Sequence, residues 1–407
     1  MGNAIDDAPF LRAILAAYRD DGPRLLYADY LEESPDPADQ ARGEFIRLQL
    51  ALAKLSDDHP RRKELTAKQN SLWQSHQGAW TSHLYGLAAG FQFRRGLLDA
   101  VSVDAAMFLA KGEELFRRAP IRRVKLNDAG RHIAKLGTCP HLGRVRELDL
   151  CGNDLGNGGL NVLLRSPHLG RVESLDISYN GIDEAGAGRL AESLLLPQLR
   201  ALRINGNSEI GSAGLAALAE SPGFAGVRFL DISGSDIDDK GIAALVRSEH
   251  AVRLHTLILH GNHIGDDGLA VLATSELLSR LLAHEPRLDL RQNQIGAAGL
   301  KKLLESPRIL PVVALDLAGN SLGDGGAHAL ATSAFLPKLR RLALAQNRMG
   351  NFGAIALAHS PLMERLAFLD VSSNALTQEG IDALWTHRKD LSAVVEYAGN
   401  YAGTTRG

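Results

Sequence analysis

Few residues in this chain combine a reactive side chain with a spacing that chemistry could use. Cys139 and His141, with His132 before them and Cys151 after them, come closest to a zinc-binding set. Zinc sites of this type use short and regular ligand spacings, which this set lacks. We therefore interpret these side chains as packed or solvent-facing, and we predict no metal-ligand residues.

Two further patterns resemble ligand-binding loops. The segment 206–212 lacks the lysine with which a P-loop reaches phosphates. The acidic turns at 265–268 and 323–326 lack the alternating acidic positions and closing glutamate of an EF-hand. They recur at places where helices are expected to begin, so we interpret them as N-caps. The capping residues would be Asp183, Ser212, Asp266, Asp324 and Asn351.

No group of side chains indicates catalysis. The tyrosines and acids of 27–33 fit a helix with one apolar face and a solvated acidic end, and the charged run 387–390 fits an exposed helix end. The fourteen histidines have no spacing that selects a Ser-His-Asp set. We predict no catalytic residues, no cofactor-binding residues and no cofactor, and a protein that is not an enzyme.

Composition points to a soluble binding protein. The 407 residues include 45 Lys and Arg against 47 Asp and Glu, so the net charge is −2 and a basic surface for nucleic acid is not expected. Two cysteines cannot form a disulfide framework. No apolar run reaches the ~18 residues that a membrane span needs. The start of the chain lacks the basic and apolar regions of a signal peptide. We expect a cytoplasmic protein with no nucleic acid or membrane partner.

A repeated unit dominates the chain after residue 145. Its template is Leu-x-Leu-x-x-Asn-x-Leu/Ile-x-x-x-Gly-x-x-x-Leu, and most copies are 27 residues apart, although one step, from Asn262 to Asn293, is 31. Nine full copies precede a degenerate copy that ends at Asn400. Such regular spacing is the signature of a stacked solenoid, because a single unit cannot bury its own leucines.

Each position of the template has a physical interpretation. Leu-x-Leu alternates like a strand with one buried face. The Asn can bond the backbone groups that the following turn leaves unpaired, so stacked turns would form an Asn ladder, in which Ser235 would substitute with a shorter reach. The Gly begins a helix, where we infer that the neighbouring turn approaches its backbone closely. The 31-residue step would lengthen one helix or its return loop.

The repeat resembles a leucine-rich repeat of the long, ribonuclease-inhibitor-like subtype. This resemblance implies an α/β fold: a horseshoe solenoid with parallel strands on the concave side and helices on the convex side. Strands are ~4.8 Å apart and packed helices ~8–10 Å, which predicts the same curvature.

The first 125 residues differ from the repeat. The strings 24–33 and 43–49 resemble the small bacterial repeat-companion domain, whose biochemical role is undefined, although Tyr30 and Gly43 depart from its usual Trp and Ala. Two short strands at 91–96 and 98–103, a helix from Asp104 and a strand ending at Leu126 would cap the solenoid, as Trp385 and Tyr397 would at its other end. The expected domains are a mostly helical companion domain at 1–85, a cap at 86–128, repeats at 129–400 and a tail at 401–407.

A partner would meet the side chains that alternate with the strand leucines, since these point into the concave face. They form an acidic row interspersed with arginines and possible aromatic anchors. The candidate partner-binding residues are Asp149, Asp176, Tyr179, Arg203, Phe229, Asp231, His260, Arg287, Asp289, Arg291, Asp316, Arg341, Phe368 and Asp370. An alternative interpretation is that the aspartates only keep an exposed strand face soluble.

The favoured function is a non-enzymatic module or scaffold that binds a protein partner, one with a partly basic surface, through this face. One alternative is a GTPase-activating regulator, which rests on fold analogy alone. Another is a ubiquitin ligase with a repeat domain as its substrate reader, although both cysteines, Cys139 and Cys151, lie within the repeats.

Overall fold

The computed structural model describes residues 7–56, 59–386 and 394–400. The expected exposed helix end at 387–390 and the expected tail at 401–407 lie outside these residues. The chain divides into two compact units. Unit 1 comprises residues 1–150 and 166–172, and unit 2 comprises residues 151–165 and 173–407.

Unit 1 begins with four helices, as the sequence predicts. Proline lies in the first turn of the first three helices, where its missing N–H costs nothing, and Asp36 caps the third through the N–H of Ala38. The helices are α1 (Ala8–Ala16), α2 (Gly22–Glu32), α3 (Pro37–Leu52) and α4 (Arg62–Thr81), and the 3-10 turn η1 (Ser82–Leu84) follows. Tyr27, Leu31 and Ile46 are in the core that these helices form against Leu97.

The sheet of unit 1 follows these helices. Its strands, in spatial order, are β1 (Ala89–Arg94), β2 (Leu97–Asp104), β3 (Arg123–Asn127) and β4 (Glu147–Asp149). β1 is antiparallel to β2, whereas β2, β3 and β4 are parallel. Asp104 caps helix α5 (Ala105–Arg118) by accepting from the N–H of Ala106. This confirms the strands and the helix expected between residues 91 and 126. Short turns complete the unit: η2 (Gly130–His132), α6 (Ile133–Leu136) and η3 (Pro140–Arg144).

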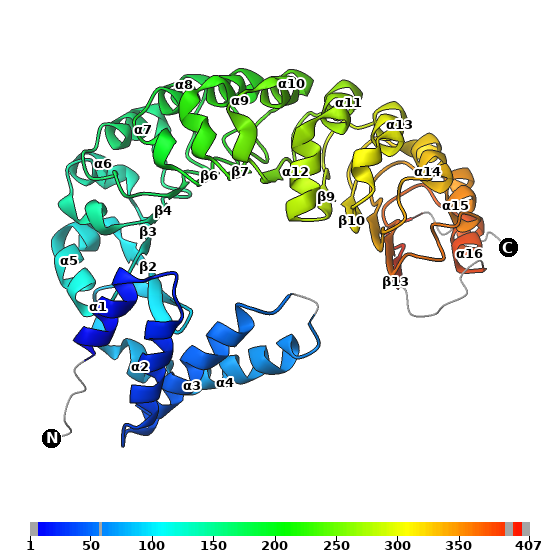
Figure 1. The fold of residues 1–407 in the computed structure, drawn as a ribbon. Helices are drawn as coiled ribbons and strands as arrows, with labels where there is room; N and C mark the ends of the chain where they lie inside the picture. The colour runs from blue at the N-terminus through cyan, green and yellow to red at the C-terminus, as the bar shows by residue number, and fades with distance from the viewer. Residues whose placement is uncertain (1–6, 57–58, 387–393, 401–407) are drawn as a thin grey trace. The chain divides into compact units, whose positions relative to one another are not determined.

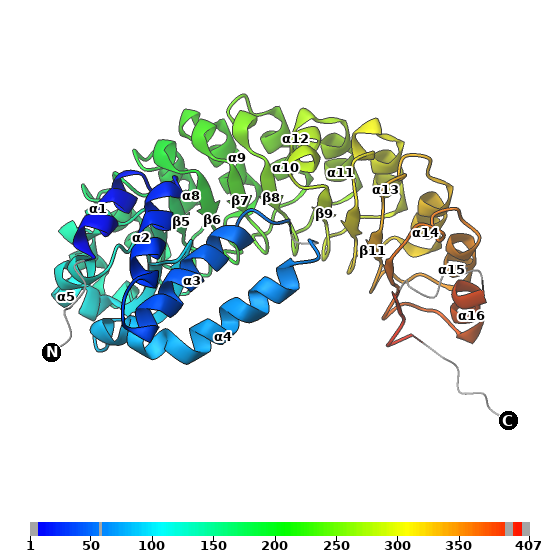
Figure 2. The same ribbon diagram turned by 60° about the horizontal axis from the view of Figure 1, so that its bottom comes forward.

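Unit 2 is a solenoid in which one short strand and one helix alternate. Figure 1 shows its parallel strands along the inner side of a curve and its helices along the outer side, and Figure 2 shows the same arrangement from another direction. The strands are β5 (Ser174–Asp176), β6 (Ala201–Arg203), β7 (Phe229–Asp231), β8 (Thr256–Ile258), β9 (Arg287–Asp289), β10 (Ala314–Asp316), β11 (Arg341–Ala343), β12 (Phe368–Asp370) and β13 (Val394–Glu396).

The helices of unit 2 cover the other side of the strands. They are α7 (Gly156–Leu164), α8 (Glu184–Ala191), α9 (Gly211–Glu220), α10 (Asp239–Arg247), α11 (Asp266–Thr274), α12 (Glu276–His284), α13 (Ala297–Glu305), α14 (Gly323–Thr332), α15 (Asn351–Ala358) and α16 (Gln378–Thr386). The 3-10 turns are η4 (Leu196–Gln198), η5 (Pro222–Gly226), η6 (Ala251–Arg253) and η7 (Pro307–Ile309). The template leucines fill the space between strands and helices, so the α/β solenoid predicted for this region is confirmed.

The predicted asparagine ladder is present. The Asn347 side chain donates to the carbonyls of Leu317 and Leu344 and accepts from the N–H of Leu322, so it joins consecutive repeats. Ser235 takes part with a hydroxyl that reaches the Ile204 carbonyl at 3.4 Å. These side chains are buried, and the ladder therefore supplies partners to turn groups that water cannot reach.

The helix glycines also have the predicted role. A Cβ added to Gly299 would lie 2.6 Å from the Cα of Asp266 in the preceding repeat. At Gly268 the corresponding distance, to the Cα of Asp239, is 3.1 Å. Glycine therefore allows neighbouring helix starts to approach more closely than any side chain would permit.

The N-cap prediction is confirmed for Asp183 only. Its carboxylate accepts from the N–H of Gly186 within its own helix. The other four residues lie in the first turn and bond the next repeat instead, so the prediction was wrong for them. Each of these side chains accepts a hydrogen bond from a backbone N–H of the next repeat. Ser212 accepts from Asp238, Asp266 from Gly296, Asp324 from Gly350, and Asn351 from Thr377. Short polar residues at helix starts thus form a second ladder between repeats.

The 31-residue step contains an additional helix. α12 occupies the return segment where other repeats have a 3-10 turn or an irregular loop. Arg280 ties it to the carbonyls of Ala251 and Leu254, and Arg308 of the next repeat bonds Ser279 and Glu276. The strand ladder is interrupted at the same place, because β8 ends one sheet and β9 begins a second of five strands.

Candidate functional site

The strand face of unit 2 is formed by the outward side chains of its strands and of the turns that follow them. Parallel pairing in register aligns these side chains in columns, with Phe229 beside Ala201, and Phe368 beside Arg341. Thirteen of the fourteen candidate residues lie on this face. The remaining one, Asp149, lies half-buried in β4 of unit 1, in register with Lys125 of β3.

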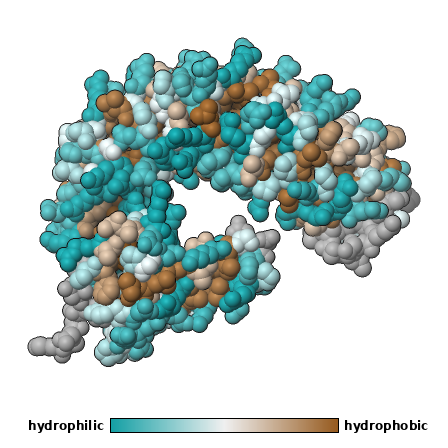
Figure 3. All heavy atoms as spheres, viewed as in Figure 1, coloured by the Kyte–Doolittle hydropathy of each residue, from teal (hydrophilic) through white to brown (hydrophobic). Residues whose placement is uncertain are grey.

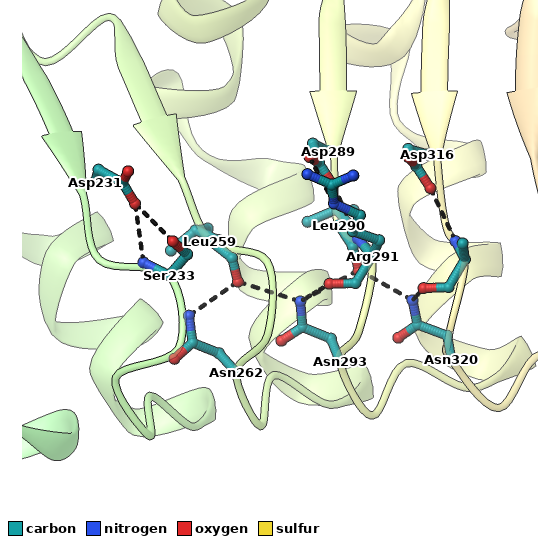
Figure 4. Close-up of polar contacts among 11 residues, drawn as sticks. Asp231, Ser233, Leu259, Asn262, Asp289, Leu290, Arg291, Asn293, Asp316 and Asn320 are labelled. Carbon is teal, nitrogen blue, oxygen red and sulfur yellow. Dashed lines mark hydrogen bonds and ion pairs between the residues drawn. The ribbon is translucent and has the colours of Figure 1, made fainter. Parts of the chain in front are cut away.

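The aspartates of the strand face have a structural role that the sequence did not indicate. Oδ1 of Asp231 accepts from the backbone N–H and from the hydroxyl of Ser233, as Figure 4 shows. The same bond to the N–H two residues further on recurs at Asp176, Asp289, Asp316 and Asp370. One oxygen of each carboxylate therefore stabilises the turn that leaves the strand.

Neighbouring charges shift the pKa of Asp316. Asp289 and Asp316 are directly paired across strands β9 and β10. Burial raises the pKa of Asp316, and the negative charges of Asp289 and Asp370 add to this effect. Arg291, whose Nε lies 3.2 Å from Oδ2 of Asp289, acts in the opposite direction on the pKa of Asp316.

Both candidate phenylalanines are covered by arginines. The guanidinium of Arg203 lies 4.4 Å from the ring centroid of Phe229, and that of Arg341 lies 4.4 Å from the ring centroid of Phe368. Such cation–π pairs hold both side chains in place and present a flat, cationic surface. The aromatic anchors expected from sequence are therefore arginine–phenylalanine stacks.

Tyr179 occupies a strained position. Its φ is +54°, in the left-handed region that side chains rarely adopt, and the matching residue is glycine in several repeats, for example Gly206 at φ +67°. The Tyr179 ring lies against Gly206, where an added Cβ would be 2.3 Å from a ring carbon. With 62% of its surface exposed, this tyrosine packs against Gly206 on one side and otherwise faces solvent.

The face of unit 2 that Figure 3 shows is mostly hydrophilic, with small apolar patches. Within residues 7–56, 59–386 and 394–400, no three His, Cys, Asp or Glu side chains gather as metal ligands. Cys139 is buried and Cys151 half-buried, and the two are not joined by a disulfide. No helix of the described segments is both long and apolar enough to cross a bilayer.

The interrupted ladder between β8 and β9 was not predicted from the sequence. Pro286 could have indicated this interruption, because proline has no N–H to donate. In six other repeats of unit 2, the residue at this position donates its N–H to the preceding repeat. Those donors are Arg200, Arg228, His255, Val313, Arg340 and Ala367. The glycines that precede the ladder Asn in most copies were a second missed signal, since they mark the left-handed position of Tyr179.

Comparison with known proteins agrees with this geometry. The family model described as "Leucine Rich repeat" matches seven segments: 172–191, 197–219, 227–246, 254–273, 287–304, 311–331 and 335–358. No curated protein sequence matches the chain.

Three solved structures are similar at low identity. One is the yeast Rad7 and Elc1 complex, at 14% identity and TM-score 0.42, covering 97% of this chain and 87% of that one. Another is an internalin (inlF) from Listeria monocytogenes, at 16% identity and TM-score 0.44, covering 91% and 93%. The third is the TLR13-ssRNA13 complex, at 16% identity and TM-score 0.36, covering 74% and 46%. The matched segments and their shared strand, asparagine and helix pattern show that this chain carries a solenoid of leucine-rich repeats.

Proposed function

We propose that the chain is a non-enzymatic interaction module that binds a protein partner through the strand face of unit 2. The observation that carries this proposal is Tyr179. A bulky aromatic residue in the left-handed region costs roughly 1–2 kcal/mol. Most repeats avoid this cost with glycine, and the three others use the unbranched or small side chains of Gln292, Gln346 and Ser373. Backbone strain of this kind persists where it serves function. Tyrosine is also enriched among binding hot spots.

The rest of the strand face fits the same role. The two arginine–phenylalanine stacks are pre-organised, so little side-chain entropy is lost when a partner covers them. Asp231 and Asp370 each have a second oxygen with which they can attract lysine or arginine of a partly basic partner, whereas the second oxygen of Asp289 already pairs with Arg291. Asp149 of unit 1 occupies the same position in its own repeat, and we propose it as a partner contact of that unit.

Cross-linking tests the proposal directly. A photo-reactive benzoyl-phenylalanine placed at Tyr179 in the full chain should capture a discrete partner in the native cell. The matched control is the same group at Phe352, an 83% exposed aromatic residue at the start of α15. Identical captured proteins at both positions, or binding of the purified partner that Tyr179→Gly leaves unchanged, would contradict the proposal.

For unit 1, we propose that residues 8–52 correspond to the repeat-companion domain. The two resembling strings pack against each other in a helical hairpin, in which Arg47 bonds Asp29 and Glu32. A Cβ on Gly43 would lie 2.8 Å from the Ala28 carbonyl, which accounts for glycine in place of alanine. We also propose that the repeats belong to the ribonuclease-inhibitor-like subtype, which the helix in each repeat supports. A cytoplasmic location is part of the same proposal.

A further inference from the structure

The outer face of helix α15 lacks the polar side chains that a surface helix normally presents to water. The eight residues of α15 include no charged side chain, although the helix lies in the outer layer of unit 2, as Figure 1 shows. Phe352 is 83% exposed, and Ile355 and Ala356, on the same side of the helix, are partly exposed. A helix that is apolar on all sides is normally buried, so the outer face of α15 is suited to a partner.

A groove of matching character lies beside α15. It has a volume of about 590 Å³ and lies between α13, α14 and the loop that follows α14. Small residues open it, because Ala298 of α13 and Gly325 of α14 occupy the position in their repeats that Phe352 occupies in α15. The apolar lining comes from Ala297, Ala298, Leu304, Ala329, Ala334 and Phe335. One surface therefore carries both an exposed aromatic ring and a groove that can receive such a ring.

The charges on either side of this surface have opposite signs. Lys301 and Lys302 of α13 share one carboxylate, that of Glu305, at 3.9 and 3.5 Å, so two lysines and one glutamate leave this helix with a net charge of +1. Helix α16 contains Glu379 and Asp382 and no basic residue, so its net charge is −2. Neither of these two acids has an ion-pair partner among the residues that the structure describes.

A two-fold axis makes this surface complementary to itself. In a C2 dimer the same surface is used by both copies, and every contact occurs twice. With the axis parallel to the helices and close to α14 and α15, Phe352 of each copy faces the groove of the other. The same axis places α13 opposite α16, where Lys301 and Asp382 occupy equivalent positions, two residues after the helix glycine of their repeats. A basic and an acidic helix therefore meet twice in the dimer.

We propose that the outer face of α13–α16 binds a second copy of this chain, with the Phe352 ring of each copy in the α13–α14 groove of the other. This self-association goes beyond the proposed function, because it uses the helix side of unit 2 and leaves the strand face free. Two strand faces held in one dimer also bind a partner that presents two copies of its surface with greater avidity.

Sedimentation velocity of the purified full chain tests the proposal. The mass should rise from that of the 43.7 kDa monomer towards twice this value as the concentration increases to about 100 µM. Phe352→Ser should weaken dimerisation about tenfold or more, because each dimer loses two buried aromatic side chains. The matched control is Leu194→Ser, which removes an 86% exposed apolar side chain after α8 and should change nothing. A wild-type chain that stays monomeric over this range would refute the proposal.

A filled groove provides a second variant. Ala329→Trp places a large side chain in the groove from α14, so it should also weaken dimerisation about tenfold or more. A mixture of Phe352→Ser and Ala329→Trp chains should associate more strongly than either chain alone, because one intact Phe352 then faces one intact groove. Thermal unfolding checks that both variants are folded. Folded variants that do not associate on mixing would overturn the proposal.

Charge reversal tests the orientation of the two copies. Lys301→Glu places an acid opposite Asp382 and should weaken dimerisation, whereas the double variant with Lys301→Glu and Asp382→Lys should restore it. Equal weakening in the single and double variants would overturn the two-fold arrangement.

Cross-linking separates this proposal from the proposed function. Benzoyl-phenylalanine at Phe352 should capture a second copy of the chain, whereas the same group at Tyr179 should capture a different protein. A monomeric chain that captures another protein at Phe352 would refute self-association alone. Dimerisation without a discrete capture at Tyr179 would refute only the proposed binding through the strand face.

Discussion

At the scale of single residues, the surroundings of two aspartates shift their pKa in opposite directions. Asp316 is half-buried beside Asp289, and the charge of Asp370 acts from two strands away, so its pKa is raised above that of an ordinary aspartate. The amide of Asn157 and the N–H of Gly186 stabilise the charge of Asp183 and lower its pKa. The two residues should therefore respond differently to pH.

Asparagine substitution tests this difference. Asp316→Asn keeps the oxygen that accepts from Ala318 and removes the charge, so its free energy of unfolding should exceed the wild-type value at neutral pH. The difference should vanish as the pH falls through the raised pKa towards that of an ordinary aspartate. Asp183→Asn should be less stable than the wild type at neutral pH and should approach it in acid, below the normal pKa of aspartate. Denaturant unfolding from pH 3 to 7 measures both, and equal pH dependence in the two variants would contradict the assignment.

At the scale of elements, glycine has two distinct roles within the helices. Gly299 contacts the Asp266 backbone, whereas a Cβ at Gly188 of α8 would meet nothing within 4 Å. Gly299→Ala should therefore cost about 1–3 kcal/mol through overpacking. Gly188→Ala should gain about 0.5–1 kcal/mol, because alanine loses less chain entropy in a helix. Thermal and urea unfolding of both variants would measure this, and a gain at Gly299 would contradict the close approach.

The asparagine ladder allows a graded test. Asn347→Ala leaves the carbonyls of Leu317 and Leu344 and the N–H of Leu322 without their partner, which should cost about 3 kcal/mol. Asn347→Ser should cost less, because Ser235 shows that a hydroxyl can make part of these bonds. Equal losses in the two variants would show that the ladder acts through packing alone.

The repeat elements could be predicted because each depends on local periodicity. Leu-x-Leu, the Asn and the helix Gly each gave the correct element, and Asp104 gave the correct cap. Contacts between repeats were harder to predict. Asp266 and Asp324 were assigned to their own helices although they bond the next repeat, since sequence does not show which N–H lies nearest in space. The turn-capping aspartates and the arginine–phenylalanine stacks were not predicted for the same reason, because both depend on which groups lie nearest in space.

At the scale of the whole molecule, repeat proteins behave as chains of nearest-neighbour interfaces, so local differences in pairing set the order of opening. Within unit 2, most neighbouring repeats are joined by a strand ladder. The repeats of β8 and β9 are joined instead by two backbone bonds, Gly261 to Arg291 and Gln294 to Ile264, and by side-chain bonds of Asn293 and Asp266. α12 compensates in part through Arg280 on one side and Arg308 on the other. We infer that the interface between β8 and β9 is the weakest within unit 2.

Native-state hydrogen exchange in increasing urea should therefore divide unit 2 into two protection classes. One class should comprise β5–β8 with α8–α10, and the other β9–β12 with α13–α15, because opening at the weak interface exposes each block separately. Arg280→Ala removes the bonds from α12 to Ala251 and Leu254, so it should widen the difference between the classes, whereas Arg348→Ala on an exposed turn should not. If all of unit 2 forms a single protection class, and Arg280→Ala does not divide it, the inference is wrong. In that case α12 and the buried leucines couple the two blocks as strongly as a continuous sheet does.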